Sequence, residues 1–156
     1  GAGSLGSNTN FAITTSSLVD GLDIGVGAGE NSDNRVTDGS AQDQSSVGGY
    51  ANYAYGPITV GYTQNYTSGA TAASSANSVV AYGIAFNVNE NLSIGASALD
   101  VDFNDGTKAD EESRAFGASY TMGSMSLKGT TATKDAQNGA SGTDDKHTEI
   151  VLSFAF

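Results

Sequence analysis

The residues of this sequence that could do chemistry are mostly carboxylates, and their densest group lies between positions 100 and 112. The stretch Asp100-Val101-Asp102-Phe103-Asn104-Asp105-Gly106, followed by Glu111 and Glu112, spaces oxygen ligands much as a calcium loop does. The glycine falls one position too late for an EF-hand, and the flanking residues alternate as strands do. Asp100, Asp102 and Asp105 could still collect a divalent cation such as Ca²⁺. A solvated acidic loop that turns at Asp105-Gly106 is the interpretation we favour.

The single histidine, His147, lies near Asp144, Asp145 and Glu149. Catalysis by such a group would need a nucleophile and an orienting partner, and no signature such as G-x-S-x-G occurs in the chain. The chain has no cysteine, which excludes thiolate zinc sites, cysteine nucleophiles and disulfides. We therefore expect no enzymatic activity and no cofactor, and interpret His147 as a surface residue near the end of a strand.

The overall composition excludes further classes of protein. The chain has 156 residues, with 17 acidic against 6 basic side chains and a formal net charge of −11. This length predicts one domain or a piece of one, and the negative charge argues against nucleic-acid binding. No apolar run is long enough for a transmembrane helix. The first residues show neither a methionine nor a signal peptide, so we expect either a removed leader or a chain that begins within a longer protein.

The elements that must position these side chains are strands. Apolar residues alternate with small or polar ones, for example at Leu92, Ile94 and Ala96 against Ser93, Gly95 and Ser97. Successive side chains of a strand point to opposite faces, so each segment has one apolar face and one small, polar face. No stretch keeps a helical period. We predict an all-β chain with about nine strands, at 9–18, 21–29, 47–55, 58–67, 78–87, 91–101, 113–122, 125–134 and 147–156.

The connections between these strands alternate in length. Tight turns at 19–21, 56–57, 87–91 and 123–124 alternate with long polar segments at 30–46, 68–77, 102–112 and 135–146, and 13 of the 17 acidic residues lie in or beside the long segments. A soluble sandwich has no reason for this alternation, whereas a transmembrane β-barrel has short periplasmic turns and long extracellular loops. The aromatic residues of the apolar register fall near both strand ends, as the two interfacial girdles of a membrane barrel do.

Two segments resemble known outer-membrane proteins. The last ten residues, His147 to Phe156, are similar to the C-terminal strand of bacterial outer-membrane barrels, which ends in Phe and has apolar residues at alternate positions. The segment Asn10 to Ala28 is similar to a hairpin of general porins, particularly alphaproteobacterial ones, with Leu18 where proline is common. Such porins have about sixteen strands, so the resemblance implies the C-terminal portion of a porin. An even-numbered bacterial barrel cannot close with nine strands, but nine fit as the last part of that larger number.

This resemblance implies a bacterial outer-membrane location and a function. We expect passive diffusion of small hydrophilic solutes and ions through a water-filled channel, with a mild preference for cations because of the acidic loops. The family is homotrimeric, contacts outer-membrane lipid and lipopolysaccharide, and is assembled by the barrel-assembly machinery, which reads the last strand, here through Ile150, Leu152, Phe154 and Phe156. The predicted inward register places these residues toward the pore: Thr59, Thr63, Ser93, Ser97, Ser119 and Lys128.

Two alternatives remain open at this point. A complete eight-stranded barrel of residues 21–156 would act as an anchor or adhesin without conduction, but its narrow interior needs larger side chains than the Gly, Ala, Ser and Thr found here. A secreted, glycine-rich adhesive β-protein would never contact lipid.

Ala96, Ala98 and Gly129 would permit close subunit packing at outward positions. Arg114, also outward, could pair with lipopolysaccharide phosphate or extend toward the membrane surface.

Overall fold

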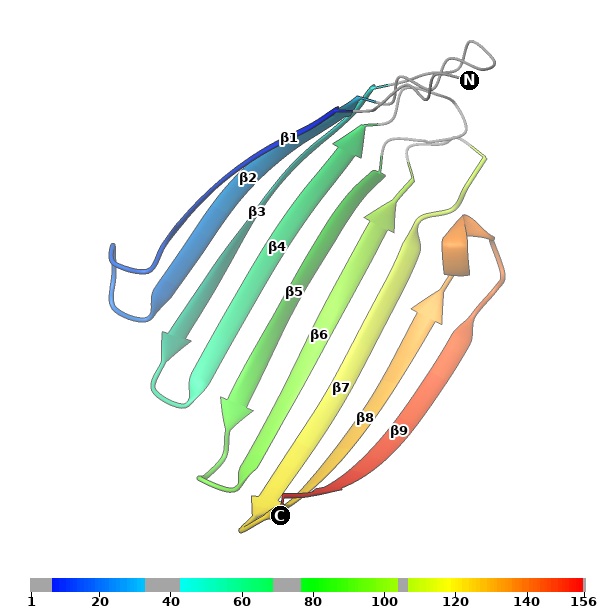
Figure 1. Cartoon of the computed structure of the whole chain (residues 1–156). Coiled ribbons are helices and arrows are strands. Elements are labelled where there is room, and N and C mark those ends of the chain that lie inside the picture. Colours follow the sequence, from blue (N-terminus) through cyan, green and yellow to red (C-terminus); the bar gives the residue numbers. More distant parts are fainter. Residues whose placement is uncertain (1–6, 33–42, 69–76, 104–106, 156) are drawn as a thin grey trace.

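The computed structural model describes residues 7–32, 43–68, 77–103 and 107–155, and it places them in one antiparallel sheet (Figure 1). Each strand pairs with its neighbours in sequence, in the order β1 to β9. The nine predicted strands are confirmed, with ends that differ by at most four residues from those expected. The strands are β1 (Ser7–Thr15), β2 (Leu22–Ser32), β3 (Asp43–Tyr55), β4 (Ile58–Ser68), β5 (Asn77–Asn87), β6 (Leu92–Asp102), β7 (Glu111–Met122), β8 (Met125–Asp135) and β9 (Asp145–Phe154).

The four predicted tight turns all lie at one end of the sheet (Figure 1). Two of them have only two residues, Gly56-Pro57 and Gly123-Ser124, and each glycine has a positive φ, +55° and +60°. Glycine at the first central position is typical of the hairpin turns whose twist matches that of the strands. In the turn before β6, the Asn89 side chain accepts the backbone N–H groups of Asn91 and Leu92, both at 2.9 Å.

The strand ends that the longer connections join lie at the opposite end of the sheet. Those predicted at 30–46 and 68–77 fall largely outside the described residues. The connection from β8 to β9 contains a short 3-10 turn, η1 (Gln137–Gly139). Among the described residues, no helix is long and apolar enough to cross a membrane.

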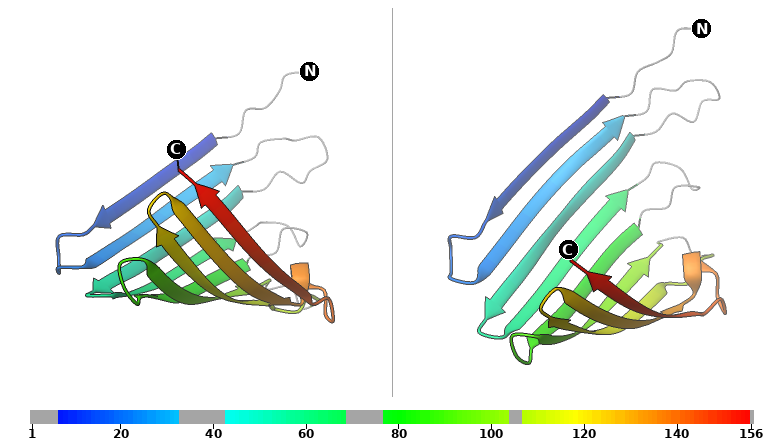
Figure 2. Two further views of the ribbon diagram at one scale, coloured as in Figure 1. Left: turned by 90° about the horizontal axis from the view of Figure 1, so that it is seen from below. Right: turned by 60° about the horizontal axis from the view of Figure 1, so that its bottom comes forward.

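The sheet is curved but open (Figure 2). Within the described part of the chain, β1 pairs only with β2 and β9 only with β8, so the structure shows a nine-stranded sheet and not a closed barrel. One hollow on its polar face runs from Asn52 on β3 to Lys128 and Thr130 on β8. A hollow that spans six strands lies on the inner side of the curve, so the polar face is concave and the apolar face is convex.

The described sheet has no hydrophobic core. Its buried apolar residues are Ala98 and Ala136, and no large described side chain is fully buried. The chain exposes 10551 Å² of surface, whereas a compact protein of this mass exposes about 7,300 Å². The fold is therefore held by backbone ladders and cross-strand pairs, with both faces left uncovered.

Candidate functional site

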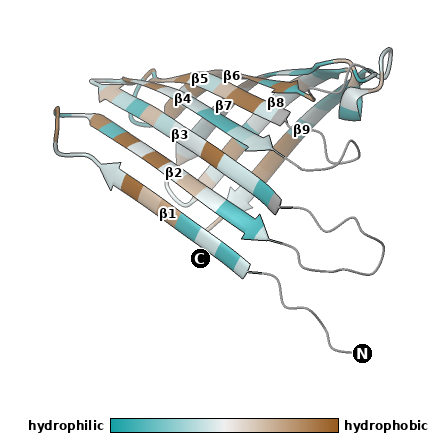
Figure 3. Cartoon of the chain, turned by 90° about the horizontal axis from the view of Figure 1, so that it is seen from above, coloured by the Kyte–Doolittle hydropathy of each residue, from teal (hydrophilic) through white to brown (hydrophobic). Residues whose placement is uncertain are grey.

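The convex face of the sheet is apolar over its middle. The strand register places large apolar side chains beside one another on this face, such as Tyr53, Val60 and Ile84 on three neighbouring strands. These side chains are exposed: Ile84 at 50%, Phe116 at 52% and Ile150 at 76%. The charged residues that the described strands place on this face all lie toward the long-loop end: Glu30, Asp100, Asp102, Glu112, Arg114, Asp135 and Lys146. The convex face thus has a band without charge. In Figure 3 the hydrophobic residues, in brown, alternate with paler ones along the strands.

Some aromatic residues of the convex face lie near a margin of this charge-free band, and others, such as Phe116, lie mid-strand. Tyr53 and Tyr55 stack with ring centroids 6.5 Å apart beside the turn before β4. Tyr66 lies near the long-loop end of β4, whereas Phe11 and Tyr82 are the middle residues of β1 and β5. The structure thus places aromatic residues toward both strand ends but also at mid-strand, and two girdles at membrane interfaces stay a prediction.

The concave face carries small and polar side chains. The six residues predicted to face a pore all lie on it: Thr59, Ser93, Ser97, Ser119 and Lys128 line the hollow across β3 to β8, and Thr63 lines a neighbouring hollow over β1 to β4. Ser93 and Ser119 are cross-strand partners whose hydroxyl groups are 2.8 Å apart. Their shared face is shown by the structure, whereas their contact with a pore stays a prediction.

Glycines on the concave face let polar side chains lie flat against the sheet. Asn10, Asn52 and Asn65 lie opposite Gly29, Gly61 and Gly48 on neighbouring strands. A Cβ added at Gly61 would be 2.7 Å from Oδ1 of Asn52, and the other two glycines are covered more closely still. The amide groups therefore lie over the glycines instead of projecting from the wall.

Tyr50 follows the same arrangement on the concave face. Its ring lies over Gly25 of β2, where any Cβ would collide with it. The Tyr50 hydroxyl donates a long hydrogen bond of 3.4 Å to Oδ1 of Asp23. The wall formed by β1 to β4 is thus lined by amide, hydroxyl and ring groups that are packed against glycine.

Charge on the concave face is confined almost entirely to one side of the sheet. The described concave positions of β1 to β6 include one charged residue, Asp23, whereas those of β7 to β9 include Glu111, Lys128, Lys134, Asp145, His147 and Glu149. Lys128 is exposed in the hollow and makes no ion pair within the described residues. His147 is exposed on β9, which confirms the expected surface position.

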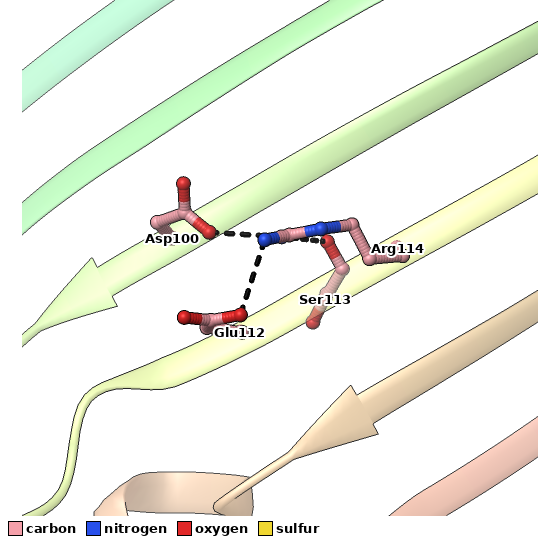
Figure 4. Close-up of polar contacts among 4 residues, drawn as sticks. All are labelled: Asp100, Glu112, Ser113 and Arg114. Atoms are coloured by element: carbon pink, nitrogen blue, oxygen red, sulfur yellow. Dashed lines mark hydrogen bonds and ion pairs between the residues drawn. The ribbon is translucent and has the colours of Figure 1, made fainter.

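Asp100 and Asp102 are the candidate metal ligands that the structure describes, and it gathers neither into a metal-binding group of described residues. Asp100 binds Arg114 through an ion pair of 2.9 Å, and Glu112 binds the same guanidinium at 3.1 Å (Figure 4). Asp105 lies outside the described residues. Over the described ranges, no group of three or more His, Cys, Asp or Glu residues is placed to hold a metal ion. Cross-strand register explains the cluster, because Asp100 is opposite Glu112 and Ala98 is opposite Arg114.

Two outward residues, Arg114 and Ala98, have surroundings that the sequence did not predict. Arg114 lies on the convex face as predicted, but its charge is already paired with two carboxylates. Ala98 is only 7% exposed because its cross-strand neighbours, Tyr82 and Arg114, are large, so Ala98 is not free for close packing with another subunit. Ala96 is exposed, and a Cβ at Gly129 would contact nothing within 4 Å, so these two positions remain open.

The last strand presents its apolar residues on the convex face. Ile150, Leu152 and Phe154 are 76%, 52% and 54% exposed, and their partners on β8 are Gly129, Leu127 and Met125. Phe156 lies outside the described residues. The amphipathic strand is confirmed, and its role as an assembly signal stays a prediction.

One buried charge was not expected from the sequence. Glu111, the first residue of β7, is 6% exposed on the concave face. Its Oε1 is 2.9 Å from Nζ of Lys134, and its Oε2 accepts the backbone N–H of Asn138 at 2.7 Å. The acidic run at 110–112 gave no sign of this burial, which depends on the loop that follows β8.

No protein-family model, curated protein or solved structure matches the chain. The structure defines a nine-stranded antiparallel sheet with one apolar and one polar face.

Proposed function

We propose that this chain forms part of the wall of an outer-membrane porin, a water-filled channel for passive diffusion of small hydrophilic solutes and ions. The observation that carries the proposal is the sheet's pair of uncovered faces. The convex face has an apolar, charge-free band, and the concave face has small and polar residues. Lipid on one side and water on the other would satisfy both faces.

The edges of the sheet support closure into a larger barrel. β1 and β9 each leave one row of backbone groups without strand partners among the described residues. Unpaired backbone groups are too costly to lie in hydrocarbon, so a membrane sheet must close on itself. We infer that further strands complete the ring between β9 and β1, up to about the sixteen strands of the general porins that the sequence resembles.

The lining of the concave face supports diffusion rather than chemistry. Small side chains, and amide groups that lie flat over glycine, leave space for water along the concave face. The proposed channel has no reaction step, and its selectivity comes from width and charge. Carboxylates around the long-loop end would concentrate cations and repel anions, an effect that salt screens.

The remaining parts of the proposal rest on the resemblance to porins. They are a homotrimeric unit, a location in the outer membrane of a Gram-negative bacterium, contact with lipopolysaccharide, and assembly through the last strand. A divalent cation at the acidic loops is not included, because Asp100 is already paired with Arg114.

The test is conductance of the complete barrel, this chain together with the strands that we infer close the ring, in planar lipid bilayers with unequal KCl on the two sides. We expect stable conductance steps and a reversal potential that shows a mild preference for K⁺. Anion preference would reject the selectivity. Protein that inserts and shows heat-modifiable migration on SDS gels but never conducts would instead be an anchor or adhesin. Protein that stays dissolved and monomeric without detergent would reject the membrane proposal altogether.

A further inference from the structure

Glu111 joins two strands to a loop. Among the charged residues that the structure describes, it alone is buried, at 6% exposure. One carboxylate oxygen binds Nζ of Lys134 on β8, and the other accepts the N–H of Asn138 in η1. Both acceptor atoms of a single side chain are therefore committed, one to the sheet and one to the connection between β8 and β9.

The connection from β8 to β9 adopts a conformation that these contacts must hold. Ala136 and Asn138 have φ values of +51° and +58°, and alanine rarely adopts this left-handed region. Gln137 N–H donates to the carbonyl of Thr143 at 2.9 Å, which closes the connection on itself. Backbone in such a state persists only where the surroundings determine it.

A second contact ties this connection to the one before β7. Ala109 N–H donates to the carbonyl of Gly139 at 3.0 Å, and the side chain of Lys108 lies against Gly139, where a Cβ would be 2.9 Å from that of Lys108. The ammonium group of Lys108 lies 4.8 Å from the centroid of the Phe103 ring. The two connections thus form one joined group of residues at the long-loop end of the sheet.

The contacts of Glu111 lie on the concave side of the sheet. Glu111 and Lys134 both belong to the concave register, which they share with Ser119 and Lys128 of the central hollow. Figure 1 shows η1 at the long-loop end, beside the ends of β7 and β8. In the proposed porin this is the outer mouth of the channel, seen from the water-filled side.

We infer that Glu111 is a positioning residue that, while ionised, holds the connection between β8 and β9 against the concave side of the channel mouth, and that its protonation releases this connection. The location of this connection at a channel mouth rests on the proposed function, but the attachment of the loop to the sheet does not depend on conduction. Glu111 lies level with the charged convex residues Glu112 and Asp135, beyond the apolar band.

The direction of the pH effect follows from the groups that face Glu111. From β8 this is Lys134, from the loop it is the Asn138 amide, and from β6 it is the uncharged partner Val101. The hydrogen bond from Lys134 lowers the pKa of Glu111 most, and the amide lowers it further, while burial opposes both. A depressed pKa means that the attachment is intact at neutral pH and is lost only as the pH falls below the ordinary glutamate range of about 4.3.

The test uses the absence of cysteine. A nitroxide attached at Ser141→Cys, an exposed position of the loop, reports loop motion by electron paramagnetic resonance in the full chain, in detergent or lipid. We expect a restricted spectrum at pH 7 and a transition to a mobile one in acid. In E111Q the restricted component should be lost at pH 7, and the acid transition should vanish with it.

The matched control is E112Q, the adjacent residue on the opposite face, whose exposed carboxylate binds Arg114. It should keep both the restricted spectrum and the acid transition of the parent. A restricted loop in E111Q, or an unchanged transition there, would overturn the inference. If E111Q does not fold, a parent loop that stays restricted down to acid unfolding would also overturn it.

Conductance recordings separate this inference from the proposed function. A released loop in E111Q without any conductance in the parent would contradict the porin and leave the positioning role intact. Conductance in the parent with no change of loop motion in E111Q would support the porin and overturn the positioning role of Glu111. If the porin proposal and the positioning role both hold, E111Q at pH 7 should show the conductance fluctuations that we expect of the parent only in acid.

Discussion

The two faces of this sheet are made by alternate residues of the same nine strands, yet they suit different surroundings. The convex face carries large apolar side chains such as Ile84 and Phe116, and the concave face carries residues such as Ser97 and Gly117. In a soluble protein one of these faces would be buried in a core. Here neither is, so whatever contacts each face must come from outside the described sheet.

The largest expected effect comes from placing the same charge on each face in turn. Ala96 and Ser97 are adjacent, small and exposed residues in the middle of β6, on the convex and concave face respectively. We expect Ala96→Arg to lower the free energy of unfolding in lipid vesicles by about 2–4 kcal/mol, the cost of arginine near a bilayer midplane. Ser97→Arg should leave it nearly unchanged, because its side chain would enter water.

Urea titration of the two variants in vesicles, followed by SDS-gel migration, measures this difference. Equal stability of the two variants would show that both faces meet water and would contradict the membrane assignment. The reverse order would show that the concave face is the one in contact with lipid.

A smaller effect distinguishes two glycines within the concave face. A Cβ at Gly117 makes only ordinary contacts at 3.4 and 3.5 Å, so Gly117→Ala should stabilise the sheet by roughly 0.5–1 kcal/mol. At Gly48 the Cβ would displace the Asn65 amide and approach the Gln64 carbonyl at 3.1 Å. Gly48→Ala should therefore lose this gain, and it should lower conductance by pushing Asn65 away from the wall. The same stability and conductance for both variants would reject the role of flat amides.

Lys128 tests whether the concave hollow lies in the path of ions. We expect Lys128→Glu to increase the preference for cations over anions, by up to about five-fold for a charge interacting in water at roughly 1 kcal/mol. Reversal potentials measure this ratio. Lys146→Glu makes the same change of charge on the convex face of β9 and should have the smaller effect; a larger effect from Lys146 would place the ion path elsewhere.

The smallest effect belongs to the Arg114 cluster on the convex face. Its side chains are half exposed, with 48% for Arg114 and 41% for Asp100. Such pairs contribute about 0–1 kcal/mol, so Arg114→Gln should change the free energy of unfolding by less than Ala96→Arg does. A loss as large as that of Ala96→Arg would mean that lipid or another subunit covers this cluster.

The sequence predicted the strands well, because alternation and turn residues are local signals. The differences of three or four residues lie at the end of β1, the end of β2 and the start of β3. The ladder between β2 and β3 continues through Asn31 and Gln44, where no apolar residue marks the strand. Backbone pairing does not require the apolar face, so strands run on into segments that look like loops. The assignment of Lys128 and five hydroxyl residues to one face was also predictable from parity alone.

The parts that could not be predicted depend on contacts distant in sequence. The burial of Glu111 needs the register of β8 and the path of η1, 27 residues further on. The pairing of Asp100 with Arg114 depends on the register of β6 and β7, which places Asp100 opposite Glu112 and was not predicted. The closure that the proposed function requires is not encoded by any periodicity within these strands.

The strict neighbour-to-neighbour pairing of this sheet makes it modular. Every strand forms its ladders with the strands immediately before and after it, so no hairpin depends on a crossover from a remote part of the chain. Pairing of this kind keeps contact order low for a β protein, since each hairpin can form from residues close together in sequence. Duplication or loss of one hairpin would therefore widen or narrow the sheet by two strands and leave the register of the other strands intact.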